Sequence, residues 1–292
     1  NRMGYTLNEY ALSSLKNERR VAGKTEDEIY GKLKLAYIEP ELRENTGEID
    51  AAEAGTLPEL ITLADMRGDL QMHTTASDGK NSIEEMAAAA KALGYEYIAL
   101  CDHSKSLRVA NGLSIARLTS QMAHVKALNR RHRGFRVLMG AEVDILTDGT
   151  MDYPREVLRK LDFVIGSIHS GFKQDEGTIT RRIAKAVQHP DVTMIAHPTG
   201  RLIGQRDPYA VDLNRIFDIA RDTHTAIEIN AQPKRLDLSD TAAKQAKERG
   251  VTLAISTDSH AKDQFAHMAL GLGVARRAWL EPKHLLNCLS LE

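Results

Sequence analysis

Residues 69–79 read DLQMHTTASDG, a short β-rich run that ends in an imidazole and is followed by a carboxylate. The run extends from Asp69 to Thr74 and carries Gln71 and His73, and Asp78 follows in the next turn. Runs of the same kind recur along the chain after Gly68. They are the segments 69–74, 97–103, 136–145, 163–169, 192–197, 226–230 and 252–258, and their starts lie 26 to 39 residues apart.

This spacing is typical of repeated strand–helix units. Several runs, such as 97–101 (YIALC) and 192–196 (VTMIA), are apolar without alternation, as strands covered on both faces are. The intervening segments, such as 82–93 and 114–131, have helical periodicity. We therefore expect an α/β fold, a (β/α)7 barrel related to the TIM barrel. Seven units favour a closed or nearly closed barrel over an open sheet, but the periodicity alone is compatible with both.

A small α+β segment, residues 1–64, precedes the repeated units. Thr25 is placed to cap a helix, and Pro40 begins a short turn or helix. The cluster Gly55–Pro58 predicts a further short helix that ends near Met66. The expected division is therefore a first segment, 1–64, and a barrel domain, 65–292.

Almost every run ends in an imidazole or a carboxylate. The carboxyl ends of the strands are where barrel enzymes build their active sites, so side chains from distant parts of the chain should converge there. A single histidine at a strand end is more often a hydrogen-bonded core residue than a ligand, but five histidines share this position. The candidates are Gln71, His73, Asp78, His103, Glu142, Asp144, His169, His197, Asp258 and His260.

Imidazole and carboxylate without thiolate are ligands suited to Zn²⁺, Mn²⁺ or Fe²⁺. The candidates are too many for one four-coordinate ion, so we expect two or three divalent ions that share a bridging carboxylate. Clustered divalent ions suit phosphate esters, because they neutralise phosphoryl oxygens, stabilise the leaving oxygen and activate water. The site chemistry therefore predicts a metal-dependent phosphoesterase.

Five separated motifs, the first of which has two parts, closely resemble those of the PHP (polymerase and histidinol phosphatase) superfamily. The resemblance covers about residues 67–292 and implies a distorted seven-stranded barrel with a trinuclear metal site. The motifs, in chain order, are Gln71–His73, Ser77–Gly79, Asp102–Ser104, Ser167–His169, Ala196–Pro198 and Asp258–His260.

The same resemblance implies a metal-binding role for nine of these ten candidates, all except Asp144. A first metal would be held by Gln71, His73, Glu142 and Asp258. A second would be held by His169 and His197, with Glu142 as the bridge, and a third by Asp78, His103 and His260. Glu142, Asp258 and His197 would be the catalytic residues. The superfamily usually has histidine where Gln71 stands, and an amide oxygen is a weaker, harder ligand, so the first metal is expected to be loosely held, absent or biased toward Mn²⁺ over Zn²⁺.

The segment before the barrel also carries a resemblance. Pro40–Glu44 followed by Gly47–Ile49, and Glu228–Asn230 followed by Arg235–Leu238, resemble bacterial family X DNA polymerases. Residues 1–64 would then be a remnant of the polymerase thumb, and the chain a piece of a longer protein whose polymerase part is its partner. No acidic cluster suited to nucleotidyl transfer precedes Gly68, so this chain is not expected to polymerise DNA.

Two arginines near the expected mouth, Arg201 and Arg235, are candidate phosphate-binding residues. A second basic feature is the run Arg130–Arg131–His132–Arg133 at the end of an expected helix. We interpret this run as a solvated helix terminus rather than a DNA-binding patch, because no aromatic residues that stack on bases are interleaved with it.

Composition and charge restrict the class of protein further. The net charge of the chain is −1, but residues 1–66 carry −5 and residues 67–292 carry +4, which favours an anionic ligand for the barrel. No apolar run approaches the roughly 20 residues that span a bilayer, and no signal pattern opens the sequence. Two cysteines are too few for a disulfide framework. A cytoplasmic protein without membrane contact is therefore expected.

These observations together predict a divalent-metal phosphoesterase, most specifically a 3′-to-5′ exonuclease that trims DNA in association with a family X polymerase and serves DNA repair. A small-molecule phosphatase of the histidinol-phosphate type is the main alternative. An amidohydrolase is disfavoured by the missing His-x-His at the first run. A degenerate barrel that serves the polymerase as a scaffold, with Gln71 as the first sign of decay, is the alternative from outside the enzymes.

Overall fold

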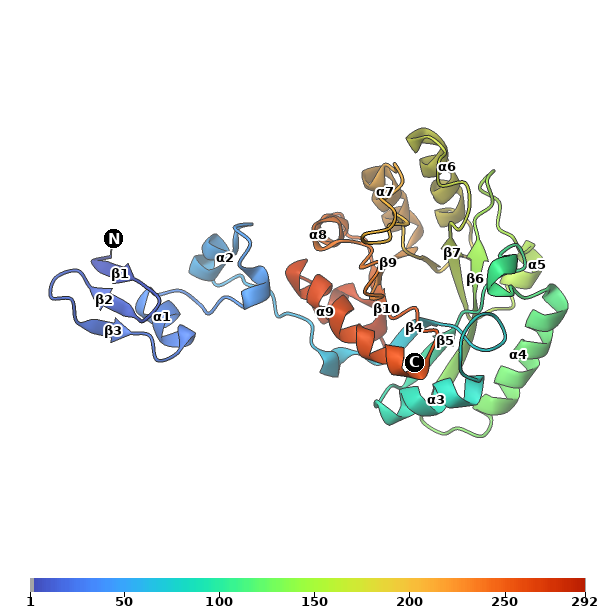
Figure 1. Ribbon diagram of the computed structural model, residues 1–292, viewed down its shortest axis with the longest axis horizontal. Helices are drawn as coiled ribbons and strands as arrows, with labels where there is room; N and C mark the ends of the chain where they lie inside the picture. Colours follow the sequence, from blue (N-terminus) through green and yellow to red (C-terminus); the bar gives the residue numbers. More distant parts are fainter. Residues whose placement is uncertain (1–2, 292) are drawn as a thin grey trace. The chain divides into compact units, whose positions relative to one another are not determined.

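The computed structural model describes residues 3–291, and the chain divides into two compact units (Figure 1). The first unit extends to Glu59 and the second begins at Leu60. This division lies five residues before the boundary expected from the sequence.

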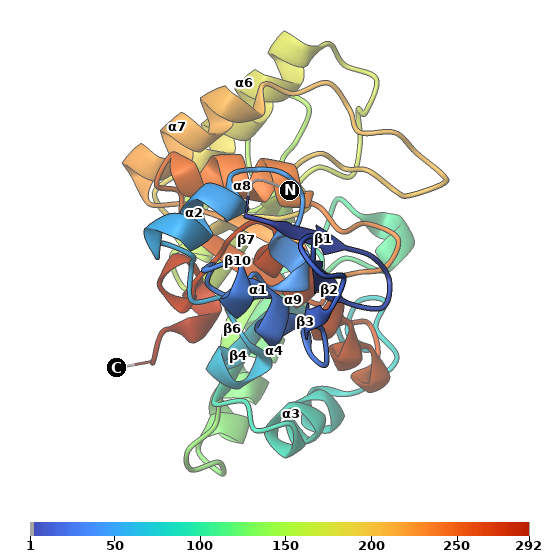
Figure 2. The ribbon, with the colours of Figure 1, turned by 90° about the vertical axis from the view of Figure 1, so that its left-hand side faces the viewer.

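The first unit combines a small sheet with short helices. Strands β1 (Tyr5–Leu7), β2 (Leu12–Ser14) and β3 (Arg20–Ala22) form an antiparallel sheet in the order β1-β2-β3 (Figure 2). Helix α1 (Glu26–Lys32) begins after Thr25, whose hydroxyl accepts a hydrogen bond from the Glu28 amide at 3.3 Å, so the predicted cap is confirmed. A 3₁₀ turn follows at η1 (Pro40–Leu42).

Helix α2 (Glu48–Ala54) was not expected, and the helix predicted to begin at Gly55 was wrong. Gly55 ends α2 instead of opening a helix, because its φ of 67° is the left-handed conformation in which glycine terminates helices. Beyond it only η2 (Leu63–Asp65) forms a single 3₁₀ turn.

The second unit is a nearly closed barrel of seven parallel strands, which confirms the predicted fold class. The strands are β4 (Gly68–Met72), β5 (Tyr97–Leu100), β6 (Arg136–Asp144), β7 (Phe163–Ser167), β8 (Met194–Ile195), β9 (Ala226–Asn230) and β10 (Leu253–Ser256), paired in sequence order. The ends of β4 and β10 also meet. Met72 forms a parallel bridge with Ser259, and the His73 amide donates to the Ser259 carbonyl at 2.8 Å.

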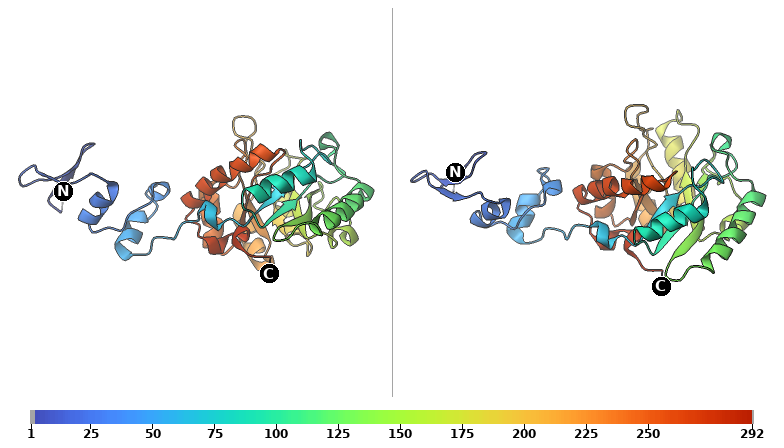
Figure 3. Two further views of the ribbon diagram at one scale, coloured as in Figure 1. Left: turned by 90° about the horizontal axis from the view of Figure 1, so that it is seen from below. Right: turned by 60° about the horizontal axis from the view of Figure 1, so that its bottom comes forward.

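Helices surround these strands (Figure 3). They are α3 (Ile83–Ala92), α4 (Ile115–Asn129), α5 (Arg155–Leu158), α6 (Glu176–Val187), α7 (Leu213–Thr223), α8 (Asp240–Glu248) and α9 (Met268–Arg277), and α6 and α7 lie side by side (Figure 2). Short 3₁₀ turns complete the unit at η3 (Arg108–Ala110), η4 (Lys262–His267), η5 (Pro282–His284) and η6 (Leu286–Cys288). Within residues 3–291, no helix is both long and apolar enough to cross a membrane.

The inner face of the barrel changes character along each strand. Residues two apart share a face of a strand, so Ala226, Glu228 and Asn230 of β9 form one inward row. The row Ala254, Ser256 and Asp258 repeats this order along β10. Apolar side chains, small ones such as Ala226 and Ala254 and large ones such as Phe163, fill the amino half of the interior, and buried polar side chains occupy the carboxyl half. The fold thus places polar groups at one mouth.

Candidate metal centre

The loops that follow the strands bring the predicted ligand candidates together at this mouth. His73 follows β4, His103 follows β5, His169 follows β7 and His197 follows β8. Glu142 lies within β6, and Asp258 and His260 follow β10. His197 and Asp258 have positive φ angles of 28° and 50°, which residues other than glycine adopt at a cost of about 1–3 kcal/mol each. The backbone is therefore strained at two of the candidate ligands.

Glu142 is the hub of the cluster. Its Oε1 lies 3.0 Å from His197 Nε2 and 3.3 Å from His169 Nε2. Its Oε2 lies 3.4 Å from His73 Nε2 and 3.3 Å from His103 Nδ1. Each oxygen thus faces a separate pair of imidazoles, which is the arrangement a bridging carboxylate requires.

A second group forms around Asp78 at the outer side of the cluster. Its Oδ1 lies 3.4 Å from His260 Nε2 and its Oδ2 lies 3.6 Å from His103 Nε2. The His73 ring stacks between its neighbours, with centroids 4.1 Å from His260 and 4.4 Å from His103. Ligand atoms of His73, Asp78, His103 and His260 all lie within 4.8 Å of one another.

Two further sets of ligand atoms meet the same 4.8 Å criterion. One joins His73, Glu142 and Asp258, and Gln71 is adjacent, with its Nε2 3.4 Å from Asp258 Oδ1. The other joins His103, Glu142 and His169. The resemblance implied His169, His197 and Glu142 as ligands of the second metal. In this set of atoms His103 stands where His197 was expected, although His197 also faces Glu142.

The unpartnered polar atoms of the cluster fit divalent metal ions. Among residues 3–291, five buried side-chain atoms of the cluster have no hydrogen-bond partner, and they belong to five of the nine candidate ligands. They are Gln71 Oε1, His73 Nδ1, His103 Nδ1, His197 Nδ1 and Glu142 Oε2. A buried polar atom without a partner costs about 1–3 kcal/mol, which coordination of a cation removes. Imidazole and carboxylate donors suit Zn²⁺, Mn²⁺ and Fe²⁺.

Burial and charge set the protonation states at the centre. Burial lowers the pKa of His197 and of His103 to about 4, which keeps both rings neutral near pH 7, as ligands must be. Burial alone would raise the pKa of Glu142, but His103, His169 and His197 hold it well below its usual range. For His169, burial is outweighed by Glu142 and Asp144, which raise its pKa to about 10. A metal that binds there must displace a proton.

Buried acids orient two of the histidines. His169 Nδ1 lies 2.6 Å from Asp144 Oδ1, and the His197 amide donates to Glu228 Oε2 at 2.5 Å. Asn230 links Glu228 to the candidate ligand Asp258, because its side-chain amide donates to Glu228 Oε2 and to Asp258 Oδ2, each at 3.2 Å. Such partners fix ligand orientation, and their loss typically weakens a metal site about 10–100-fold.

A cavity of about 340 Å³ opens above the cluster, and basic side chains reach its wall. Arg235 lines it, with Nε 3.7 Å from Asp258 Oδ2, and its buried Nη1 has no hydrogen-bond partner among residues 3–291. Arg201 does not line it; its Nε donates to the Arg235 carbonyl at 2.7 Å and its Nη2 to the Leu236 carbonyl. The geometry of Arg201 therefore supports a role in holding the loop that carries Arg235.

The reading from sequence missed Arg206, which does line the cavity. Its guanidinium lies 4.0 Å above the Phe172 ring and donates to the Gly200 carbonyl at 2.7 and 2.9 Å. Arg206 is five residues from Arg201 in the same loop, so its proximity to the His197 motif was the one available signal. Leu107 and Val109 of the 107–110 turn complete the apolar rim, and no local pattern marks them.

A seven-stranded parallel barrel with these ligands defines a class of enzyme, the barrel hydrolases that hold several divalent ions at the carboxyl ends of their strands. The PHP domain family matches residues 69–232, and the chain belongs to this family. Residues 1–44 match the DNA polymerase beta thumb. The family and the ligand set together make the barrel a metal-dependent phosphoesterase domain.

Relatives of known name agree with this assignment. The chain is 44% identical over 289 residues to the DNA polymerase/3′-5′ exonuclease PolX of Bacillus subtilis (strain 168), a match over 99% of this chain and 50% of that protein. The chain thus spans about half the length of this relative. It is also 30% identical over 204 residues to a "Probable phosphatase" of Caldicellulosiruptor saccharolyticus, covering 66% of this chain and 80% of that protein.

The barrel also resembles a solved structure. Histidinol phosphate phosphatase from Lactococcus lactis subsp. lactis Il1403, complexed with zinc, L-histidinol and phosphate, superposes with a TM-score of 0.54 at 16% identity. The match covers 73% of this chain and 94% of that one. At this identity the likeness supports the fold alone.

Proposed function

We propose that the barrel is a phosphodiesterase that removes nucleotides from the 3′ end of DNA, as part of a cytoplasmic family X polymerase. The observation that carries the phosphoester chemistry is the position of Glu142, whose two oxygens each face a separate pair of histidines. DNA as the substrate is supported by the thumb match at residues 1–44 and by the name of the B. subtilis relative.

The residues divide into three ligand sets. Gln71, His73, Glu142 and Asp258 would hold one divalent ion, His169, His197 and Glu142 a second, and Asp78, His103 and His260 a third. When bound, these ions would neutralise phosphoryl oxygens and activate water for attack on phosphorus. Mn²⁺ and Zn²⁺ both suit this set of donors.

The protein's own groups bind and orient the substrate. Arg235 lines the cavity beside Asp258, and its guanidinium would donate to a phosphate oxygen bound there, where charge develops as the ester is cleaved. Asp144 and Glu228 hold His169 and His197 in place. Val109 and Phe172 give the rim of the cavity an apolar surface.

The polarity of cleavage gives the direct test. With Mn²⁺, the protein is expected to shorten 5′-labelled single-stranded DNA in one-nucleotide steps from its 3′ end, and removal of the metal by a chelator should stop the reaction. Release of the 5′ label as a mononucleotide, or rapid turnover of L-histidinol phosphate with no action on DNA, would contradict the proposal.

A small-molecule phosphatase is the second candidate. The cavity of about 340 Å³ has room for a small ester, and the L. lactis structure of similar fold contains L-histidinol and phosphate. A small-molecule phosphatase does not account for the match of residues 1–44 to a polymerase thumb, and we therefore prefer DNA as the substrate.

Whether Gln71 binds metal separates two hypotheses, a fully active enzyme and a degenerate barrel that serves as a scaffold. Its Oε1 is buried without a partner among residues 3–291, so the amide can serve as a weak ligand. Because imidazole binds Zn²⁺ and Mn²⁺ more strongly than an amide does, Gln71→His is expected to raise metal affinity and the phosphodiesterase rate together. Titration of metal against the rate of cleavage measures both. An unchanged affinity and rate would show that Gln71 is no ligand.

A further inference from the structure

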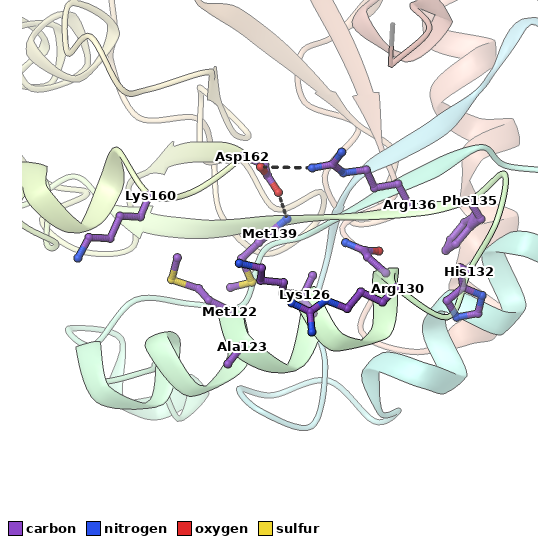
Figure 4. Close-up of a pocket in the computed structure, with 12 residues that line it drawn as sticks. Met122, Ala123, Lys126, Arg130, His132, Phe135, Arg136, Met139, Lys160 and Asp162 are labelled. Atoms are coloured by element: carbon purple, nitrogen blue, oxygen red, sulfur yellow. Dashed lines mark hydrogen bonds and ion pairs between the residues drawn. The ribbon is translucent and has the colours of Figure 1, made fainter.

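A basic groove lies on the outside of the barrel, beside α4 and away from the metal centre (Figure 4). It has a volume of about 680 Å³ and runs between α4, the first half of β6 and the segment before β7. We call it the α4 groove. Helix α5, which would cover the outer face of β6 in a regular barrel, has only four residues, so this side of the strand is left open.

The charge of the α4 groove is strongly positive. Lys126 of α4 and Arg130, which follows the last residue of α4, line one wall, and Arg136 and Lys160 line the rest. Among residues 3–291, Lys126, Arg130 and Lys160 form no ion pair with a carboxylate. The one acid, Asp162, accepts a hydrogen bond from the Met139 amide at 2.9 Å and lies 4.0 Å from Arg136 Nη2.

The apolar residues at the base of the groove are almost covered. Val125 is 2% exposed, and Phe135 and Met139 are each 5% exposed. Half-buried Met122 and exposed Ala123 add a small apolar area on the α4 side, far less than the apolar centre that a protein interface needs. Four cations with one engaged acid instead fit a ligand that is recognised by repeated negative charge, as the phosphate backbone of a nucleic acid is.

We propose that the α4 groove binds the phosphate backbone of single-stranded DNA that extends away from the metal centre. The identity of the ligand as DNA rests on the proposed function. Arg136 and Glu142 are six residues apart on β6, which places the groove about 20 Å from the metal centre along the strand. At about 3.4 Å per stacked nucleotide, some six nucleotides span this distance. Within the basic run at residues 130–133, Arg130 lines the groove, so the proposal revises the interpretation of that residue as part of a solvated helix terminus.

The test uses the full chain loaded with Mn²⁺ and a fluorescent single-stranded oligonucleotide of about 15 nucleotides, with phosphorothioate linkages that resist cleavage. Lys126→Gln/Arg130→Gln is expected to weaken binding several-fold. The slope of log K against log salt concentration should become less steep by about 1.4, because each lost phosphate contact on a single strand removes about 0.7 from that slope. Lys126→Gln/Lys160→Gln makes the same test without touching the end of α4. Lys91→Gln/Arg215→Gln, an equal loss of charge on α3 and α7, is the matched control and should bind as the parent does.

Cleavage assays separate this proposal from the proposed function. For a cleavable 15-mer, the α4 groove variants should raise KM more than they lower kcat, and the effect should vanish for a dinucleotide. Unchanged binding and salt dependence in both variants would overturn the α4 groove even if the chain cleaves DNA. Tighter binding of poly-glutamate than of DNA would overturn it as well, by assigning the groove to an acidic protein. Groove-dependent binding by a chain that cannot cleave DNA would uphold the groove and refute the exonuclease.

Discussion

Glu142→Gln is expected to reduce phosphodiester hydrolysis by more than about 100-fold and to remove at least one bound metal ion per chain. Loss of a residue that only hydrogen-bonds to a metal ligand already lowers metal affinity or activity about 10–100-fold, and loss of a bridging ligand should lower them further. Glu142 is 1% exposed and each of its oxygens faces two histidines. Two divalent ions a few ångströms apart repel each other, and the bridging charge offsets that repulsion. Glutamine keeps the shape of the side chain but not its charge.

Elemental analysis and a metal-titrated cleavage assay measure the two effects. Glu156→Gln, which removes an exposed carboxylate from α5, is the control and should leave both unchanged. His169→Ala should lose chiefly one metal, and excess Mn²⁺ should restore part of its rate, since water can replace one imidazole. Glu142→Gln with a full complement of metal and a near-normal rate would show that Glu142 is not the bridge.

Arg182→Met is expected to lower the free energy of unfolding of the barrel by about 3 kcal/mol or more, because it leaves several buried acceptors without donors. Arg182 of α6 is 2% exposed. Its guanidinium donates to the carbonyls of Ile145 at 2.5 Å, Leu146 at 2.9 Å and Ser170 at 3.1 Å, and to Gln174 Oε1 at 2.6 Å. These segments follow β6 and β7 and flank Asp144 and His169.

Thermal unfolding measures this prediction, with an expected decrease in Tm of about 6–12 °C for a unit of this size. Arg181→Met is the matched control, because Arg181 is exposed and, within the described part of the chain, its guanidinium donates to Thr178 Oγ1 at 2.8 Å and to no other group. Its change should stay within about 0.5 kcal/mol. Equal melting temperatures for the two variants would contradict the assigned role of Arg182.

The barrel and the ligand candidates could be predicted from sequence because local pattern and tertiary position coincide there. A parallel strand that is apolar to its end and then turns polar places that polar residue at the mouth, wherever the strand lies in the chain. His73 and His197 satisfy this rule, and Glu142 lies near the carboxyl end of β6. The helix boundary at Gly55 could not be predicted in this way. Glycine can stand at either end of a helix, and only the left-handed backbone of Gly55 shows that it ends α2.

Residues that act through tertiary contacts were harder to find. Arg182 shares the apolar face of α6 with Ile179 and Ile183, but its charge would ordinarily predict exposure, as for its neighbour Arg181. Arg201 and Arg206 share one loop, and the choice of which one faces the cavity depends on the Arg235, Leu236 and Gly200 carbonyls. The α4 groove likewise depends on the shortness of α5, which the spacing of the strands did not reveal.

Anomalous scattering from crystals of the purified protein, recorded at the Zn and Mn absorption edges, tests the central claim most directly. The account predicts two or three peaks at the mouth of the barrel, with one ion on each side of the Glu142 carboxylate at ligand distances of about 2.0–2.2 Å. Crystals that contain either metal but show no peak beside Glu142 would contradict it.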